Sequence, residues 1–175
     1  MRVGSSADTL TNWTSPTTTL ELDLLPKEIV ALVLFEKPTH WTGYFTQFYQ
    51  FLTKKPYWKY VHCVLYLRYS SHYWARTELT WDGYCDDTVT GTVVEDTHSL
   101  VVPLFRSQVS NQLSRSIDLQ RTFSFLGESG RYSPWVSLLH LFTGSYQWNC
   151  VSTVAYTLGT DPCHLPSDLL EVLLK

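Results

Sequence analysis

Two neighbouring segments rich in aromatic and β-branched residues constrain the fold most strongly. Residues 58–69 and 73–81 are rich in Val, Tyr, Trp and Thr, and a short polar stretch separates them. This composition predicts the two strands of an antiparallel hairpin. A continuous apolar run at 29–35 has the length of a buried strand. We therefore expect an antiparallel sheet at the centre of the fold.

Helical patterns flank this strand-rich region. A spacing of i, i+4, i+7 and i+8 predicts an amphipathic helix carrying four apolar side chains: Tyr44, Phe48, Phe51 and Leu52. Further periodic segments predict four helices, at 110–126, 135–142, 151–158 and 169–174, with start or stop signals at Ser133-Pro134, Gly127, Gly159 and Ser167-Asp168. A strand-rich first part followed by helices predicts an α+β fold, with helices packed against the antiparallel sheet.

The connection after the hairpin is harder to assign. Asp82-Gly83 marks a turn, and we interpret the acidic stretch around Cys85, with Asp86 and Asp87, as a solvated part of that turn. Weaker strand patterns follow at 91–95 and 99–104. Residues 1–19 are Ser/Thr-rich and predict a flexible or adaptable N-terminal arm, which leaves 20–175 as a single domain.

Charge and composition exclude several classes of function. A net charge of −3 gives no basic face for nucleic acid, and no apolar run is long enough for a transmembrane segment. The N-terminus shows no signal peptide, so we expect a cytoplasmic protein or one delivered within a larger particle. The 4 cysteines lack the spacing of zinc ligands, so no metal or other cofactor is expected.

Cys150 is the candidate nucleophile. It follows Asn149, which stands where a helix N-cap would lie, so Cys150 would be the first helical residue. The helix N-terminus lowers the pKa of a thiol, and the backbone N–H of Cys150 could stabilise a developing oxyanion. The alternative is that Cys150 is a small buried apolar residue, as many free cysteines are.

His62 is the candidate base, and the register of the hairpin decides whether Glu78 can orient it. A three-residue loop at 69–71 pairs Arg68 with His72 and places His62 directly opposite Glu78 on one face. A carboxylate there would fix the imidazole and complete a Cys-His-Glu triad. A two-residue loop would instead place Glu78 on the other face, where it would be a solvated residue paired with Arg76 or another neighbour.

Four residues beside this triad are candidates for substrate binding. Gln147 and Trp148 precede the nucleophile and could shape an acyl pocket, although Trp148 equally suits the core. Asn149 adjoins the nucleophile in sequence, and Tyr60 alternates with His62 along its strand.

These motifs, taken in order, resemble those of circularly permuted NlpC-type, papain-like cysteine hydrolases, which include the lecithin–retinol acyltransferase-like proteins. The similar elements span residues 28–174: a strand beginning His-x-x-x-Tyr (62–66), a strand with a glutamate before a glycine (77–83), Asn-Cys at a helix start (149–150), and a Leu-Pro-Ser-Asp-Leu-Leu tail (165–170). The resemblance implies a permuted papain-like fold with Cys150 as nucleophile, His62 as base and Glu78 as the orienting residue. Cys63 departs from the family pattern, in which Val or Ile is frequent.

The expected function is a thiol-dependent hydrolase or acyltransferase acting on an amide or ester through a thioester intermediate. Following the resemblance, its substrate would be a peptide, another amide or a lipid ester. The alternative is a catalytically silent papain-like module with a binding or structural role in an oligomer or larger assembly. A small zinc-stabilised domain is a third possibility.

Overall fold

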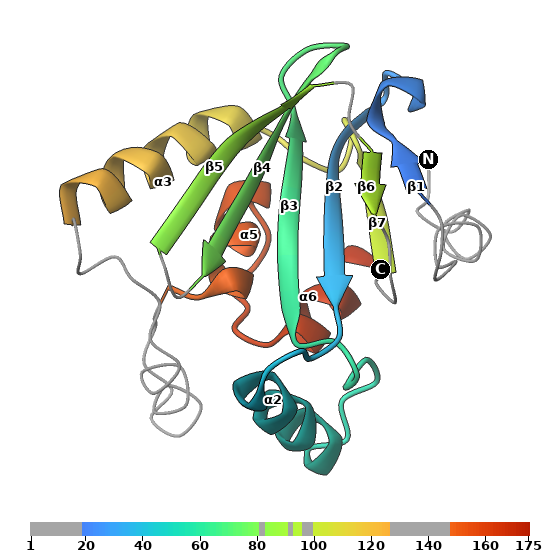
Figure 1. Cartoon of the computed structure of the whole chain (residues 1–175), viewed down its shortest axis with the longest axis vertical. Helices are drawn as coiled ribbons and strands as arrows, with labels where there is room; N and C mark the ends of the chain where they lie inside the picture. Colours follow the sequence, from blue (N-terminus) through green and yellow to red (C-terminus); the bar gives the residue numbers. More distant parts are fainter. Residues whose placement is uncertain (1–18, 81–82, 91–92, 96–99, 127–147) are drawn as a thin grey trace.

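The computed structural model of the chain describes residues 19–80, 83–90, 93–95, 100–126 and 148–175 (Figure 1). Its main feature is a 5-stranded sheet of order β5-β4-β3-β2-β7, in which every neighbouring pair is antiparallel. The strands are β2 (Ile29–Glu36), β3 (His62–Arg68), β4 (Tyr73–Thr80), β5 (Gly83–Thr90) and β7 (Leu100–Phe105). A separate 2-stranded sheet pairs β1 (Thr19–Glu21) with β6 (Val93–Glu95).

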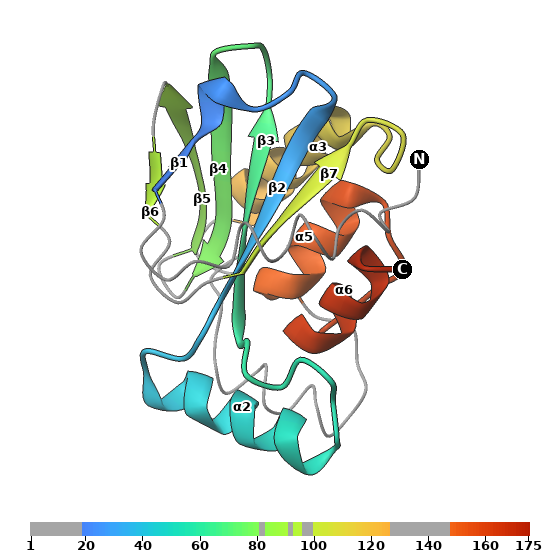
Figure 2. The same cartoon turned by 90° about the vertical axis from the view of Figure 1, so that its right-hand side faces the viewer.

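The helices lie on one face and at one end of the large sheet. Figure 2 shows α3, α5 and α6 on the same side of the sheet, β1 and β6 on the opposite side, and α2 beyond the end where β2 finishes and β3 begins. The helical elements are the 3-10 turn η2 (Leu22–Leu24), α2 (Trp41–Leu52), α3 (Gln112–Leu126), α5 (Cys150–Leu158) and α6 (Pro166–Leu173). The predicted α+β class, with an antiparallel sheet packed against helices, is confirmed.

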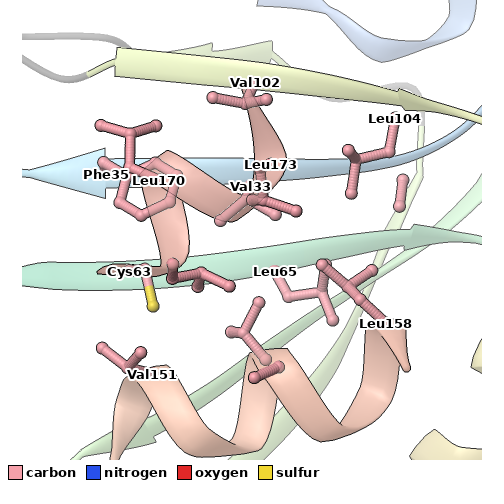
Figure 3. Close-up of a cluster of buried hydrophobic side chains, with 14 of the residues drawn as sticks. Val33, Phe35, Cys63, Leu65, Val102, Leu104, Val151, Leu158, Leu170 and Leu173 are labelled. Atoms are coloured by element: carbon pink, nitrogen blue, oxygen red, sulfur yellow. The ribbon is translucent and has the colours of Figure 1, made fainter. Parts of the chain in front are cut away.

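The main core fills the space between the sheet and helices α5 and α6 (Figure 3). Alternate residues of the central strands point into it, including Val33, Cys63 and Leu65, and they meet Val151 and Leu158 of α5. The intervening strand residues belong to a second buried cluster on the other face: Leu32, Leu34, Val64 and Tyr66. The two central strands are therefore buried on both sides, which explains the continuous apolar run of β2.

The hairpin forms as predicted, but its register is wrong by two residues. Arg68 pairs with Trp74 rather than His72, and Tyr69 donates its N–H to the Tyr73 carbonyl across a Ser70–His72 loop. The observed loop has the predicted odd length, although it lies one position later in the chain. An odd loop leaves every side chain on its expected face, because only an odd shift in pairing would exchange the faces.

Two other assignments need correction. The stretch around Cys85 is no turn: β5 runs through it and pairs with β4 along its whole length. As the edge strand of the sheet, β5 carries polar residues such as Asp86 and Asp87, which hid its strand pattern. The last helix begins at Pro166, three residues before the predicted start at Leu169. By contrast, α5 spans the predicted residues and ends at Gly159, whose φ of 72° suits a glycine C-cap.

Some predictions fall outside the described residues: the N-terminal arm at 1–18, Asp82, the stop at Gly127, the helix at 135–142 and Gln147. Among the helices that the structure does describe, none has both the length and the apolar character needed to cross a bilayer.

Candidate active site

The start of α5 fixes the position of Cys150. Asn149 caps the helix: its Oδ1 accepts from the Ser152 backbone N–H at 2.8 Å, and Ser152 Oγ accepts in return from the Asn149 N–H at 2.7 Å. Asn149 Nδ2 also donates to the His164 carbonyl at 3.1 Å. The predicted N-cap is therefore confirmed, and it holds Cys150 as the first residue of the helix.

The sulfur of Cys150 lies where the β3–β4 ladder stops. Tyr69 and Tyr73 form a backbone hydrogen bond between β3 and β4. In an antiparallel ladder such hydrogen-bonded pairs recur at every second residue. After the Leu65–Thr77 pair, the next hydrogen-bonded pair would therefore be Cys63–Leu79. The ladder ends at Leu65, so the Cys63 backbone N–H is outside it, and this N–H is one of the groups that lower the pKa of Cys150. One strand amide is thereby turned from the sheet toward the candidate nucleophile.

Cys63 contributes its side chain as well. Its Sγ lies 3.4 Å from the Cys150 carbonyl oxygen, and its single S–H proton, when donated to the Cys150 sulfur instead, is the largest cause that lowers the pKa of Cys150. Figure 3 shows the Cys63 sulfur directed from β3 toward the first turn of α5. The residue that departs from the family pattern thus contacts the candidate nucleophile with both its backbone and its side chain.

His62 and Glu78 are brought together as the sequence predicts, although along a diagonal. In the observed register Glu78 lies across from Val64, two residues further along β3, on the same face as His62. Its long side chain spans that offset, and Oε1 lies 2.6 Å from His62 Nε2. The second carboxylate oxygen forms an ion pair with Arg76. The pairing with Arg76 is therefore present, but the solvated position on the other face is wrong, because the Glu78 side chain is only 11% exposed and contacts His62.

The imidazole and the thiol belong to opposite faces of the sheet. By strand alternation His62 shares the face of Val64 and Tyr66, whereas Cys150 packs on the side of Cys63 and α5. They nevertheless lie close enough that Cys150 raises the pKa of His62 and His62 lowers the pKa of Cys150. Since Glu78 occupies Nε2 of the ring, Nδ1 is the nitrogen left for the Cys150 sulfur.

These contacts favour a thiolate–imidazolium pair. The Cys63 thiol does most to lower the pKa of Cys150; with the charge of His62 it outweighs burial and holds that pKa well below its ordinary value. Burial alone would lower the pKa of His62, but the Cys150 and Glu78 charges raise it well above its ordinary value. Burial alone would raise the pKa of Glu78, but the hydrogen bonds and charges of His62 and Arg76 lower it. The carboxylate therefore stays ionised beside the ring.

Sequence reasoning missed one acidic neighbour of the histidine. Glu36, the last residue of β2, lies directly across from His62, and burial raises its pKa. Its only sequence signal is its place at the end of the apolar run, where a charged residue normally marks the end of a buried strand. The charges of His62, Glu78 and Arg76 also act on the pKa of Glu36, so this carboxyl belongs to the same electrostatic cluster.

Two further candidates, Trp148 and Tyr60, are close in sequence to the site residues and make packing contacts. Trp148 packs with Leu79 and Leu119 and makes an edge-on ring contact with Tyr156, with ring centroids 5.7 Å apart. Tyr60 packs against the main core and contacts Phe35 edge-on at 6.5 Å. Cys163 is buried, which raises its pKa to about 11. In the described part of the chain, no group of three or more His, Cys, Asp or Glu side chains could hold a metal ion.

Comparisons of the chain with protein-family models, with curated proteins and with solved structures found no match. The resemblance to the permuted papain-like hydrolases therefore stays an expectation.

Proposed function

We propose that the protein is a thiol-dependent hydrolase or acyltransferase with a permuted papain-like fold. The observation that carries this proposal is the chain of contacts from Glu78 through His62 to Cys150, with the pKa values of the thiol and the imidazole shifted in opposite directions. An activated nucleophile next to a base that a third group orients is the general signature of covalent acyl-transfer catalysis. Buried structural cysteines, by contrast, have raised pKa values, as Cys163 does.

The proposed reaction proceeds in two halves. The Cys150 thiolate attacks the carbonyl carbon of an amide or ester, and the Cys150 backbone N–H at the helix start stabilises the oxyanion. The His62 imidazolium then gives its proton to the departing nitrogen or oxygen, which leaves a thioester on Cys150. Neutral His62 next removes a proton from water or from an acceptor alcohol or amine, whose attack releases the acyl group and restores the thiolate.

Several features of the architecture support the permuted papain-like interpretation. The strand that carries the histidine precedes the helix that carries the nucleophile, which is the reverse of the papain order. The helix packs on an antiparallel sheet, and its first residue lies beside the start of the histidine strand. The third residue comes from the adjacent strand, β4. A peptide, another amide or a lipid ester remains the expected substrate class.

The proposal is tested by alkylation of the purified protein with iodoacetamide, with the modified peptides identified by mass spectrometry. We expect Cys150 to react selectively at neutral pH, much faster than Cys163, and His62→Ala to slow its reaction strongly. Cys163→Ser is the matched control, because it removes a thiol outside the site. A Cys150 that reacts at the rate of an ordinary buried thiol would refute the proposal.

One observation favours the second candidate, a silent module in a larger assembly. Cys150 is only 7% exposed, so its sulfur offers little surface to a substrate. A second experiment, incubation of the protein with an activated ester, separates the two candidates. A reactive Cys150 that never forms a thioester with activated esters or amides would favour the silent module.

A further inference from the structure

Helix α2 presents its apolar face to solvent. Six of its large apolar side chains are between 40% and 59% exposed: Trp41, Tyr44, Phe45, Phe48, Phe51 and Leu52. At about 100° per residue, these six positions occupy one continuous arc of roughly 120° around the helix. The predicted amphipathic helix is present, but an amphipathic surface helix ordinarily turns its apolar stripe toward the core.

The polar face of α2 is the one that holds it to the protein. Gln50, opposite the apolar arc, is completely buried. Its Nε2 donates to the Trp58 carbonyl at 3.1 Å and to the Tyr60 carbonyl at 2.7 Å, while its Oε1 accepts from the Ser167 N–H at 3.0 Å. Gly43 also faces inward, since an added Cβ there would lie 2.9 Å from Pro38 Cβ. The inverted orientation is therefore specified by hydrogen bonds and close packing.

The surroundings of this apolar face are basic. Residues 37–61 contain four lysines and no Asp or Glu, in a chain whose net charge is −3. Lys54 directly follows the C-cap of α2, and Lys59 stacks over the Trp58 ring, 5.6 Å from its centroid. Lys55 is the exception, because its Nζ pairs with Asp168 Oδ1 at 2.8 Å. The helix thus combines an aromatic face with lysines at its margin.

We propose that α2 docks the protein onto the surface of an anionic phospholipid membrane. Aromatic side chains on an interfacial helix bury into the boundary between headgroups and acyl chains, while flanking lysines attract anionic headgroups. A second copy of this chain fits less well, because residues 37–61 of that copy carry four lysines and no Asp or Glu and so offer no acidic group to Lys54 and Lys59. An anionic lipid surface satisfies both the apolar and the basic features.

Docking through α2 would also orient the rest of the molecule. The helix connects the end of β2, with Glu36, to the start of β3, with His62, and lies beyond that end of the sheet (Figure 1). A membrane bound by α2 would therefore face the end of the sheet that carries the candidate active site. The docking itself does not depend on the chemistry proposed for Cys150.

The test is co-sedimentation of the full chain with vesicles of phosphatidylcholine, alone or mixed with phosphatidylserine. We expect binding to the mixed vesicles that weakens with added salt. The double variant Phe48→Ser/Phe51→Ser should lower the affinity by more than about tenfold. The control Tyr73→Ser removes an equally exposed aromatic residue from β4 and should leave binding unchanged.

Charge variants test the basic margin separately. Lys54→Gln and Lys59→Gln should each weaken binding to the mixed vesicles by about fivefold and reduce its salt dependence. Lys27→Gln, which removes an exposed lysine outside this segment, should have no such effect. Circular dichroism of each variant establishes that it is folded.

Two outcomes overturn the proposal: no binding to the mixed vesicles, or binding that Phe48→Ser/Phe51→Ser leaves intact. Self-association through α2 in ultracentrifugation, without vesicle binding, would assign the face to a second copy instead. Cys150→Ser should bind vesicles as the wild type does, so a failure of the proposed catalysis and a failure of docking are distinguishable.

Discussion

Replacing Cys63 by valine tests whether Cys63 contributes to the reactivity proposed for Cys150. Cys63 is completely buried, and its thiol is the strongest influence that lowers the pKa of Cys150. Valine is apolar and somewhat larger than cysteine, and it keeps the backbone N–H that lowers the pKa of Cys150, but its side chain has no proton to donate. The substitution therefore removes one hydrogen bond to the nucleophile and leaves the helix start and His62 in place.

The size of the effect follows from the kind of bond that is lost. A hydrogen bond to a charged group contributes about 1.5–3 kcal/mol, and a thiol is a weak donor, so we take the lower end of that range. About 1.4 kcal/mol corresponds to a tenfold change in equilibrium. We therefore expect the pKa of Cys150 to rise in Cys63→Val. At pH values below the wild-type pKa of Cys150, alkylation of Cys150 should be about tenfold slower in Cys63→Val than in the wild type.

The assay is the rate of alkylation of Cys150 by iodoacetamide across a range of pH, followed by mass spectrometry of the Cys150 peptide. Cys63→Ser should restore much of the rate, because a hydroxyl can donate in place of the thiol. Cys163→Val is the matched control for loss of a buried thiol and should leave the profile unchanged. An unchanged or faster rate in Cys63→Val would refute the assigned role of Cys63.

Three further predictions concern the same region. Glu78→Gln should lower the pKa of His62, move the alkaline limb of esterase activity to lower pH and reduce kcat by about a hundredfold, as seen with an activated ester substrate. In the wild type, kcat/KM should rise with pH through the lowered pKa of Cys150 and fall as pH passes the raised pKa of His62; a profile without the alkaline fall would argue against His62 as the proton donor. Gln50→Leu should lower the free energy of unfolding by about 2–4 kcal/mol in urea titrations, because it leaves two carbonyls and one N–H without their partner; Gln47→Leu, which loses one bond of 3.3 Å, should cost under about 1 kcal/mol.

The hairpin shows how far sequence reasoning reaches in a sheet. The composition of β3 and β4 was sufficient to predict an antiparallel pair, and an odd loop was sufficient to place His62 and Glu78 on one face. The loop contains no glycine, so no turn type fixed the position of the pairing, and two registers of the same parity share every side-chain orientation. Contact between the two residues was predicted, but its diagonal geometry was not.

The orientation of α2 could not be read from its apolar pattern. Periodicity shows that one face is apolar, but it carries no information about what that face contacts. The one local signal is Gln50, which stands opposite the aromatic arc. A buried glutamine with three backbone partners holds the helix more specifically than an apolar contact would, because each hydrogen bond depends on a defined geometry.

The role of Cys63 was equally hidden. In sequence it is one apolar residue of a strand, and its departure from the family pattern suggested only a difference in packing. Its importance arises from the point where the β3–β4 ladder stops and from the approach of α5, and both are tertiary features. Polar edge strands such as β5 are hard to predict for a related reason, because their exposed residues need not follow the apolar pattern of a strand that packs on a core.

The early end of the β3–β4 ladder affects both the stability of the sheet and the reactivity proposed for Cys150. If Cys63 and Leu79 were paired, the sheet would gain a hydrogen-bonded pair, but the Cys63 amide would no longer be available to the Cys150 sulfur. A variant in which this ladder is extended should be more stable, and its Cys150 should be less reactive if the proposed function holds. At the unpaired end of these two strands, selection for stability and selection for reactivity would therefore favour opposite changes.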